Sequence, residues 1–276
     1  MEFEIETKEL KKVMTVIKAI NTDVNMDITS EGIGIKVFDT STVCFLEALI
    51  KQPISIDANI KEPLKIGFNT AKFLDVLKRF NGKVKINIGL SDVTLSCDKK
   101  KISLKQMAIA EETKSPELSF NASCKIQDED FKNILADATI TETEAIRFVA
   151  QDSTLMATSG EMIRYETEVK TSESVFNGRQ KGTYAIEYLE KALGIFDTLK
   201  FEFSSDYPCK LSGETDKLKM SLVVAPRVTD DEPEMPEPKA KEPKHINDGE
   251  LDVSTLPDKA DGKTDVEFLA EMDSEK

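Results

Sequence analysis

The sequence contains a single histidine among its 276 residues, and this scarcity restricts the chemistry open to the folded part. His245 lies in a stretch rich in proline, lysine and glutamate, so we expect neither a histidine-based catalytic triad nor a multi-histidine metal site. The cysteines Cys44, Cys97, Cys124 and Cys209 are scattered and form no C-x-x-C pair. We therefore expect reduced, mostly buried thiols in an intracellular protein, and no zinc or other metal.

The sequence also lacks long apolar runs and recognisable nucleotide-binding or catalytic motifs. No apolar run approaches the ~18–20 residues of a membrane-spanning helix, so we expect no transmembrane segment. The opening stretch MEFEIETKEL has neither the basic nor the apolar region of a secretory signal. Glu31–Lys36 contains a G-x-G without a third glycine, which indicates a hairpin turn and not a nucleotide loop. Nothing in the sequence supports an enzyme or a bound cofactor.

The acidic charge is distributed unevenly along the chain. The formal net charge is -14, but the body, Met1–Thr229, has 35 acids and 31 bases and so a net charge of only -4. The remaining 230–276 has 16 acids, 6 bases and five of the ten prolines, with Phe268 as its one aromatic residue. Such an acidic, proline-rich composition predicts a disordered tail.

Short segments of alternating apolar and polar residues dominate the body and predict strands with one buried face. Only four stretches have helical periodicity, and each is followed by several strands. This order is typical of antiparallel sheets, so we predict an α+β fold. The predicted helices are Lys8–Ile20, Ala71–Phe80, Glu129–Ala138 and Ala185–Phe196.

An internal repeat relates the two halves of the body. The stretch Phe68–Asp92 matches Tyr184–Asp206, with apolar residues at corresponding positions. We therefore predict two similar domains, each built from two copies of a helix-plus-strands unit. The polar stretch around Pro116 is the natural linker between them. The predicted boundaries are 1–109 for the N-terminal domain, 110–122 for the connector and 123–229 for the C-terminal domain.

The first predicted helix has one apolar and one basic face. In LKKVMTVIKAI, Leu10–Ile20, the apolar residues recur at intervals of three and four positions, and lysines occupy the other side. A solvated surface explains such a face on one helix. In a strongly acidic chain it also fits a surface reserved for an anionic partner.

The body resembles a sliding clamp of the proliferating cell nuclear antigen (PCNA) type. The resemblance covers about Met1–Val228, and four pieces in family order carry it: LKKVMTVIKAI, DITSEGIGIKVFDTSTVCFLEAL, MATSGE and the closing LVVAPRV. It implies a head-to-tail trimeric ring of two-domain subunits around double-stranded DNA, without catalytic activity. Such a ring tethers DNA polymerase and other replication and repair enzymes, such as a nuclease or a ligase, and is placed by a clamp loader. It would be nucleoid-associated in the cytoplasm of an archaeon and nuclear in a eukaryote.

In this family the helices line the hole of the ring, where basic side chains face the DNA phosphates. The third and fourth predicted helices carry few bases and several acids, which departs from the family pattern. The DNA-facing positions that the resemblance implies are Lys11, Lys12, Lys18, Lys72, Lys78, Arg79, Lys132 and Lys191.

The resemblance also implies a subunit interface between two edge strands. Lys101–Ile109 is expected to pair with Ile163–Val169 of the next subunit. Edge strands suit this role because they present unpaired amide and carbonyl groups. The interface candidates are Ile102, Leu104, Tyr165 and Val169.

A third implied site is an apolar pocket beneath the connector, which receives a short helical peptide of a partner. The connector departs from the family pattern, because the polar residues Thr113, Lys114 and Ser115 stand where relatives have apolar ones. The matching pocket positions are Phe38, Thr42, Val43, Phe45, Tyr207, Pro208, Val223, Ala225, Pro226 and Val228.

Two other functions remain open on the sequence alone. The chain fits a checkpoint-type clamp subunit of a heterotrimer, which has the same fold with different clients. It also fits a monomeric processivity factor that grips DNA with one basic face. The mass in solution distinguishes the monomer from a ring, and the sequence leaves open whether a ring consists of identical or different chains.

Overall fold

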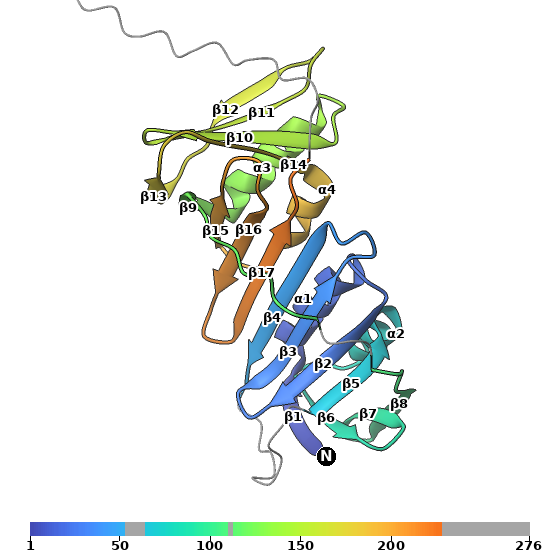
Figure 1. Ribbon diagram of the computed structural model, residues 1–276. Coiled ribbons are helices and arrows are strands. Elements are labelled where there is room, and N and C mark those ends of the chain that lie inside the picture. Colours follow the sequence, from blue (N-terminus) through green and yellow to red (C-terminus); the bar gives the residue numbers. More distant parts are fainter. Residues whose placement is uncertain (53–63, 110–112, 228–276) are drawn as a thin grey trace, which may run out of the picture. The chain divides into compact units, whose positions relative to one another are not determined.

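The structure is a computed structural model that describes residues 1–52, 64–109 and 113–227 (Figure 1). All of these residues fall in one compact unit, Met1–Asp230. The predicted disordered tail, 230–276, and Val228 lie outside the described residues, as do three residues of the predicted connector.

The first half of the described chain contains two helices and eight strands that follow one another with short connections. They are β1 (Glu2–Glu6), α1 (Thr7–Lys18), β2 (Asp23–Thr29), β3 (Gly32–Phe38), β4 (Cys44–Lys51), β5 (Leu64–Asn69), α2 (Thr70–Leu77), β6 (Lys83–Ile88), β7 (Asp92–Cys97) and β8 (Lys100–Lys105).

The second half repeats this order with one additional strand. Its elements are β9 (Ala122–Gln127), α3 (Asp128–Thr139), β10 (Ala145–Gln151), β11 (Thr154–Ser159), β12 (Tyr165–Glu168), β13 (Ser172–Phe176), β14 (Gln180–Ala185), α4 (Ile186–Leu189), the 3₁₀ turn η1 (Glu190–Ala192), β15 (Thr198–Phe203), β16 (Cys209–Glu214) and β17 (Leu218–Val224).

The strands form three antiparallel sheets, as the predicted α+β class requires. Two sheets have four strands each, in the orders β1-β6-β7-β8 and β12-β11-β10-β14. The third has nine strands, in the order β13-β9-β15-β16-β17-β4-β3-β2-β5. Each half exchanges leading strands between its two units, since β1 pairs with β6 and β9 pairs with β15. This exchange binds the two units of a half together.

The nine-stranded sheet runs through both halves because β17 pairs with β4 along their whole lengths (Figure 1). The register extends from Leu218 opposite Ile50 to Val224 opposite Cys44. Continuous backbone hydrogen bonding across this junction makes the two halves one sheet structure, so segments far apart in sequence meet there.

The amphipathic first helix forms as its pattern predicts. Leu10, Val13, Met14 and Ile17 are all completely buried, and α1 packs beside α2. The second half has an aromatic core, in which Phe131 of α3 lies between strands of different sheets. Its ring centroid is 5.9 Å from those of Phe148 and Phe201, whose rings are 4.9 Å apart.

The fourth predicted helix is shorter than its sequence pattern. Instead of Ala185–Phe196, the helix spans Ile186–Leu189 and continues only as a 3₁₀ turn to Ala192. Leu193 is extended, and Gly194 has a positive φ of 72°, a conformation that ends helices and that glycine adopts at little cost. The apolar periodicity therefore continues past the point where the backbone leaves the helix.

All four cysteines are free thiols, and Cys44, Cys124 and Cys209 are buried. Burial raises the pKa of the Cys44 and Cys124 thiols to about 12. These thiols are therefore protonated at neutral pH and act as small apolar core residues. Among the described residues, no helix is long and apolar enough to cross a membrane.

Candidate functional site

Exposed cations gather on the touching helices α1 and α2. Lys18 lies at the end of α1, Lys72 in the first turn of α2, and Lys78 and Arg79 directly after α2. The Asn69 side chain caps α2 by accepting the Lys72 N–H at 3.1 Å, which fixes where the helix begins. None of these four side chains makes an ion pair within the described part of the chain. They are therefore available to an anionic ligand.

The two neighbouring lysines of α1 are held by local partners. The Lys11 ammonium donates to the backbone oxygen of Phe80 and to Oδ1 of Asn81, the latter at 3.4 Å. Lys12 lies 3.5 Å from the Glu9 carboxylate on the preceding turn. Lys11 thus ties α1 to the chain that follows α2.

The second half offers fewer available cations, as its composition predicts. Lys132 is exposed on α3, but Asp128, Glu129 and Asp130 occupy the first turn of that helix. These acids are favourable there because the helix dipole is positive at its N-terminus. Lys191 is half-buried, with its ammonium 4.0 Å from the centroid of the Tyr188 ring, so the structure places it against an aromatic face.

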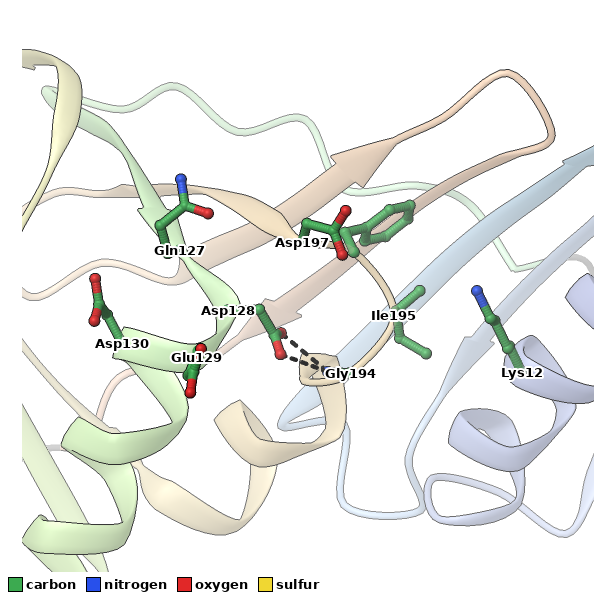
Figure 2. Close-up of a pocket in the computed structure, with 9 residues that line it drawn as sticks. Lys12, Gln127, Asp128, Glu129, Asp130, Gly194, Ile195 and Asp197 are labelled. Atoms are coloured by element: carbon green, nitrogen blue, oxygen red, sulfur yellow. Dashed lines mark hydrogen bonds between the residues drawn. The ribbon is translucent and has the colours of Figure 1, made fainter.

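A cavity of about 580 Å³ lies beside these acids (Figure 2). Figure 2 shows the Asp128 carboxylate directed at the Gly194 backbone, whose N–H it accepts at 2.9 and 3.1 Å. Among the described residues, Lys12 is the only basic one that lines this cavity, and four acids line it as well. Its lining is therefore unsuited to phosphate. The lining residues are Lys12, Gln127, Asp128, Glu129, Asp130, Gly194, Ile195, Phe196 and Asp197.

Apolar side chains from distant segments meet where β4 pairs with β17, and we call this region the β4–β17 seam. The rings of Phe38 and Phe45 lie 4.8 Å apart, and Phe45 is opposite Val223 in the register. The Ala225 N–H donates to the Val43 carbonyl at 2.8 Å and extends the pairing beyond β17. The seam consists of Phe38, Thr42, Val43, Phe45, Tyr207, Pro208, Val223, Ala225 and Pro226.

The seam is accessible over most of its length. Phe45 and Val223 are buried beneath it, Thr42 is exposed, and the other six side chains are partly exposed. The Tyr184 hydroxyl donates to the Tyr207 carbonyl at 2.9 Å, which anchors the segment before β16. The structure thus brings together every described position that the sequence implied for the partner pocket.

The end of the connector contacts the same region. The Phe120 ring is edge-on to that of Tyr207, with 6.1 Å between the centroids. The hydroxyl of Ser115 is buried and has no hydrogen-bond partner within the described residues. The polar connector therefore packs onto the body despite its departure from the family pattern.

The strands β8 and β12 each end a four-stranded sheet. Ile102, Leu104 and Tyr165 are partly buried against the core of their own chain. Val169, directly after β12, is only 3% exposed, so only its backbone is open to a partner. Burial raises the pKa of the Tyr165 hydroxyl, and the charge of Asp137 adds to this effect.

Exposed apolar side chains lie at the ends of β8 and β12, in addition to the four interface candidates named from the sequence. Ile109 and Ile163 are end residues of the two stretches expected to pair, and Met162 lies just outside them. Met162 is fully exposed and Ile163 is 54% exposed just before β12, while Ile109 is 54% exposed after β8. A run such as EMIRY reads equally well as a strand end with one buried face. Only the structure shows that neither side chain joins the core.

Comparisons with known proteins agree on one family. Residues 1–97 match the family model described as "Proliferating cell nuclear antigen, N-terminal domain". The DNA polymerase sliding clamp of Thermococcus fumicolans is 25% identical over 250 residues, which cover 83% of this chain and 100% of the relative. That of Methanobrevibacter smithii is 25% identical over 235 residues, which cover 81% of this chain and 96% of the relative.

Solved structures resemble the fold over nearly their full lengths. The structure of the C-terminal region of FEN-1 bound to A. fulgidus PCNA superimposes with a TM-score of 0.74 at 17% identity, covering 83% of this chain and 99% of that one. PCNA from Entamoeba histolytica gives a TM-score of 0.72 at 19% identity, covering 82% and 98% of the two chains. At these identities the likeness shows the fold, and it includes both halves of the chain.

Proposed function

Since this chain is a PCNA-type sliding clamp, we propose that it is a DNA polymerase processivity factor that encircles duplex DNA as a trimeric, head-to-tail ring. The observation that carries the proposal is the set of unpaired cations on α1 and α2 in a chain of net charge -14. Such a charge distribution attracts DNA to one face and repels it from the rest of the surface.

The helix face contacts the phosphate backbone and does not read the base sequence. Lys18, Lys72, Lys78 and Arg79 carry the contact, because flexible side chains can follow phosphates as the ring slides. The acid-lined cavity beside α3 disfavours phosphate, so the DNA contacts mainly the first half of each subunit. Lys132 and Lys191 contribute less than their counterparts on α1 and α2.

The β4–β17 seam binds the peptides of client enzymes. The A. fulgidus relative was solved with the C-terminal region of FEN-1 bound, and the fold places this chain's apolar seam on its surface. A short peptide with apolar and aromatic anchors would cover the partly exposed Phe38, Val43 and Pro226. DNA polymerase, a clamp loader, a nuclease and a ligase are the expected clients.

The proposed ring holds these enzymes on DNA without catalysing a reaction of its own. Its contribution is an effective concentration: a client bound to a ring that cannot leave the template rebinds the same DNA after each dissociation. The protein is accordingly expected wherever the chromosome of its cell is replicated.

A topological experiment tests the proposal. Fluorescently labelled full-length protein is loaded on nicked circular DNA by the clamp loader of the same organism, and free protein is removed by gel filtration. A ring stays on the circle and is released when a restriction enzyme linearises it. A one-faced monomeric grip would be lost at the same rate from circular and linear DNA, and that result would overturn the proposal.

A further inference from the structure

The turn between β3 and β4 holds Thr42 in a backbone conformation that its side chain disfavours. Thr42 has a φ of 57°, in the left-handed region that β-branched residues rarely adopt. Such a conformation costs free energy, so it persists only where surrounding contacts fix the backbone. The dihedral angles of Thr42 also set the direction in which the chain enters Val43, and both residues belong to the β4–β17 seam.

Asp39 supplies the contacts that fix this turn. Its N–H donates to the Cys44 carbonyl at 2.9 Å, and its carbonyl accepts the Thr42 N–H at 3.1 Å. Oδ1 of its carboxylate accepts the Cys44 N–H at 2.8 Å. Asp39 therefore bonds both to the strained residue and to the first residue of β4.

The second carboxylate oxygen of Asp39 is held from the other half of the chain. The Tyr188 hydroxyl, on α4, donates to Oδ2 at 2.9 Å. The Tyr188 ring packs against the core, and the Lys191 ammonium lies 4.0 Å from the ring centroid. Because Asp39 is buried, water does not easily replace the hydroxyl if it is removed. The conformation of the turn thus depends on a contact from α4.

Val43 is the seam residue whose position depends most on this turn. Phe38 lies on β3 opposite Phe45 on β4, and Phe45 lies opposite Val223 on β17, so the hydrogen bonds of the sheet fix these three. Val43 precedes β4 and is partly exposed, and its carbonyl accepts the Ala225 N–H at 2.8 Å. A change at Thr42 would therefore move an apolar side chain at the end of a rigid row.

We propose that Asp39 and Tyr188 are positioning residues of the β4–β17 seam, which hold Thr42 in its left-handed conformation and so keep Val43 where a client peptide binds it. The inference rests on the client binding of the proposed function and extends it to two side chains outside the seam. Without the Tyr188 hydroxyl, Thr42 relaxes towards negative φ in part of the molecules. The apparent dissociation constant then rises in inverse proportion to the fraction that keeps the competent turn.

Calorimetric titration of the full chain with a synthetic peptide from the C-terminal region of FEN-1 tests the proposal. Tyr188→Phe should weaken binding about fivefold, which corresponds to a competent turn in about one fifth of the molecules. Thr42→Asn should suppress this loss, because asparagine adopts the left-handed region at lower cost than threonine. In the Thr42→Asn background, adding Tyr188→Phe should weaken binding less than about twofold.

Hydrogen exchange of the turn gives a readout that does not require the peptide. In Tyr188→Phe, the amides of 39–45 should exchange about tenfold or more faster than in the unmodified chain, as measured by mass spectrometry. Thr42→Asn should reverse most of this acceleration. Thr94→Val is the control, because it removes a hydroxyl from the Thr94–Ser103 pair on β7 and β8, with 2.8 Å between the oxygens. It should change neither the exchange of the turn nor the affinity for the peptide.

The possible results separate this inference from the client site itself. Equal affinity of the unmodified chain and Tyr188→Phe would overturn the positioning role, although the seam would still bind clients. A loss that Thr42→Asn does not suppress would also overturn it, because the strained turn would then not be the cause. If the peptide does not bind the unmodified chain at all, the client site of the proposed function is wrong and this inference fails with it.

Discussion

The Tyr188 hydroxyl donates a hydrogen bond to Oδ2 of Asp39 across 2.9 Å and so links α4 of the second half to the turn between β3 and β4 of the first. The other oxygen of Asp39 accepts the Cys44 N–H at 2.8 Å, within the same turn. Asp39 is only 7% exposed, so both bonds compensate the burial of its carboxylate. The turn they hold carries Thr42 and Val43 of the β4–β17 seam.

Removing this hydroxyl should destabilise the protein without disturbing its core. Tyr188→Phe leaves one oxygen of a nearly buried carboxylate without its donor, which should lower the free energy of unfolding by about 1–2 kcal/mol. Urea unfolding followed by circular dichroism measures this difference. Tyr207→Phe is the control, because the structure gives the Tyr207 hydroxyl no partner among the described residues; its effect should stay within about 0.5 kcal/mol. Equal effects of the two variants would refute the role of the Asp39 bond.

The same pair makes a specific pH dependence. Burial, together with the bond to Asp39, raises the pKa of the Tyr188 hydroxyl from an ordinary value of 10.0 to about 12. The protonated form is therefore the one stabilised by folding. The resulting contribution to the free energy of unfolding is fully present below pH 10. It is lost as the pH rises towards 12, because the unfolded chain releases the Tyr188 proton at a lower pH than the folded chain does.

The stability difference between the unmodified chain and Tyr188→Phe should therefore be constant up to about pH 9 and narrow between about pH 10 and pH 12. The other tyrosines and the cysteines titrate in both proteins, so their contributions to the pH dependence of the unfolding free energy cancel in this difference. Unfolding free energies measured in urea at a series of pH values give this curve. A difference that stays constant to pH 12 would show that the Tyr188 proton is not held by the fold.

The sequence predicted the fold where local pattern and tertiary packing agree. The apolar stripe of α1 is buried as a unit, and the α+β class with antiparallel sheets is confirmed. The fourth helix was overpredicted, because the stripe through Phe196 continues although Gly194 turns the backbone out of the helix. Hydrophobic periodicity reports which face is buried, and it does not report where a helix ends.

The candidate sites also divide into features that a local sequence pattern predicts and features that depend on contacts between distant segments. The exposed cations of α2 follow from a pattern within one helix, so the sequence predicts their exposure. The placement of Lys191 over the Tyr188 ring and of Lys11 on the Phe80 carbonyl depends on contacts between distant segments. The cavity between Lys12 and the acids of α3 is lined by residues more than a hundred positions apart. No local sequence pattern predicts such a cavity.

Charge reversal on α2 should weaken DNA binding in a salt-dependent way. Lys72→Glu with Lys78→Glu removes two proposed phosphate contacts. The slope of log K against log salt should therefore fall by about 2, since each contact releases nearly one counterion. Fluorescence anisotropy of a labelled duplex at several salt concentrations measures this slope.

The control for this variant carries the same kind of change on a strand. Lys36→Glu reverses a charge on β3, where Lys36 lies 3.4 Å from Glu47 and away from the helices. It should leave the salt slope unchanged. A reduction of the slope by Lys36→Glu about half as large as that of the double variant, in proportion to the charge reversed, would show that DNA binding depends only on the net charge of the protein.

A charge within the β4–β17 seam should weaken client binding while preserving the fold. Val43 is partly exposed in the turn before β4, so Val43→Glu places a carboxylate where an apolar anchor would otherwise pack. We expect affinity for a synthetic peptide from the C-terminal region of FEN-1 to fall about tenfold or more in calorimetry. Leu90→Glu, at a fully exposed turn before β7, is the matched control and should bind as the unmodified chain does. Unchanged affinity of Val43→Glu would move the client site away from the seam, because a desolvated carboxylate cannot be tolerated inside an apolar contact.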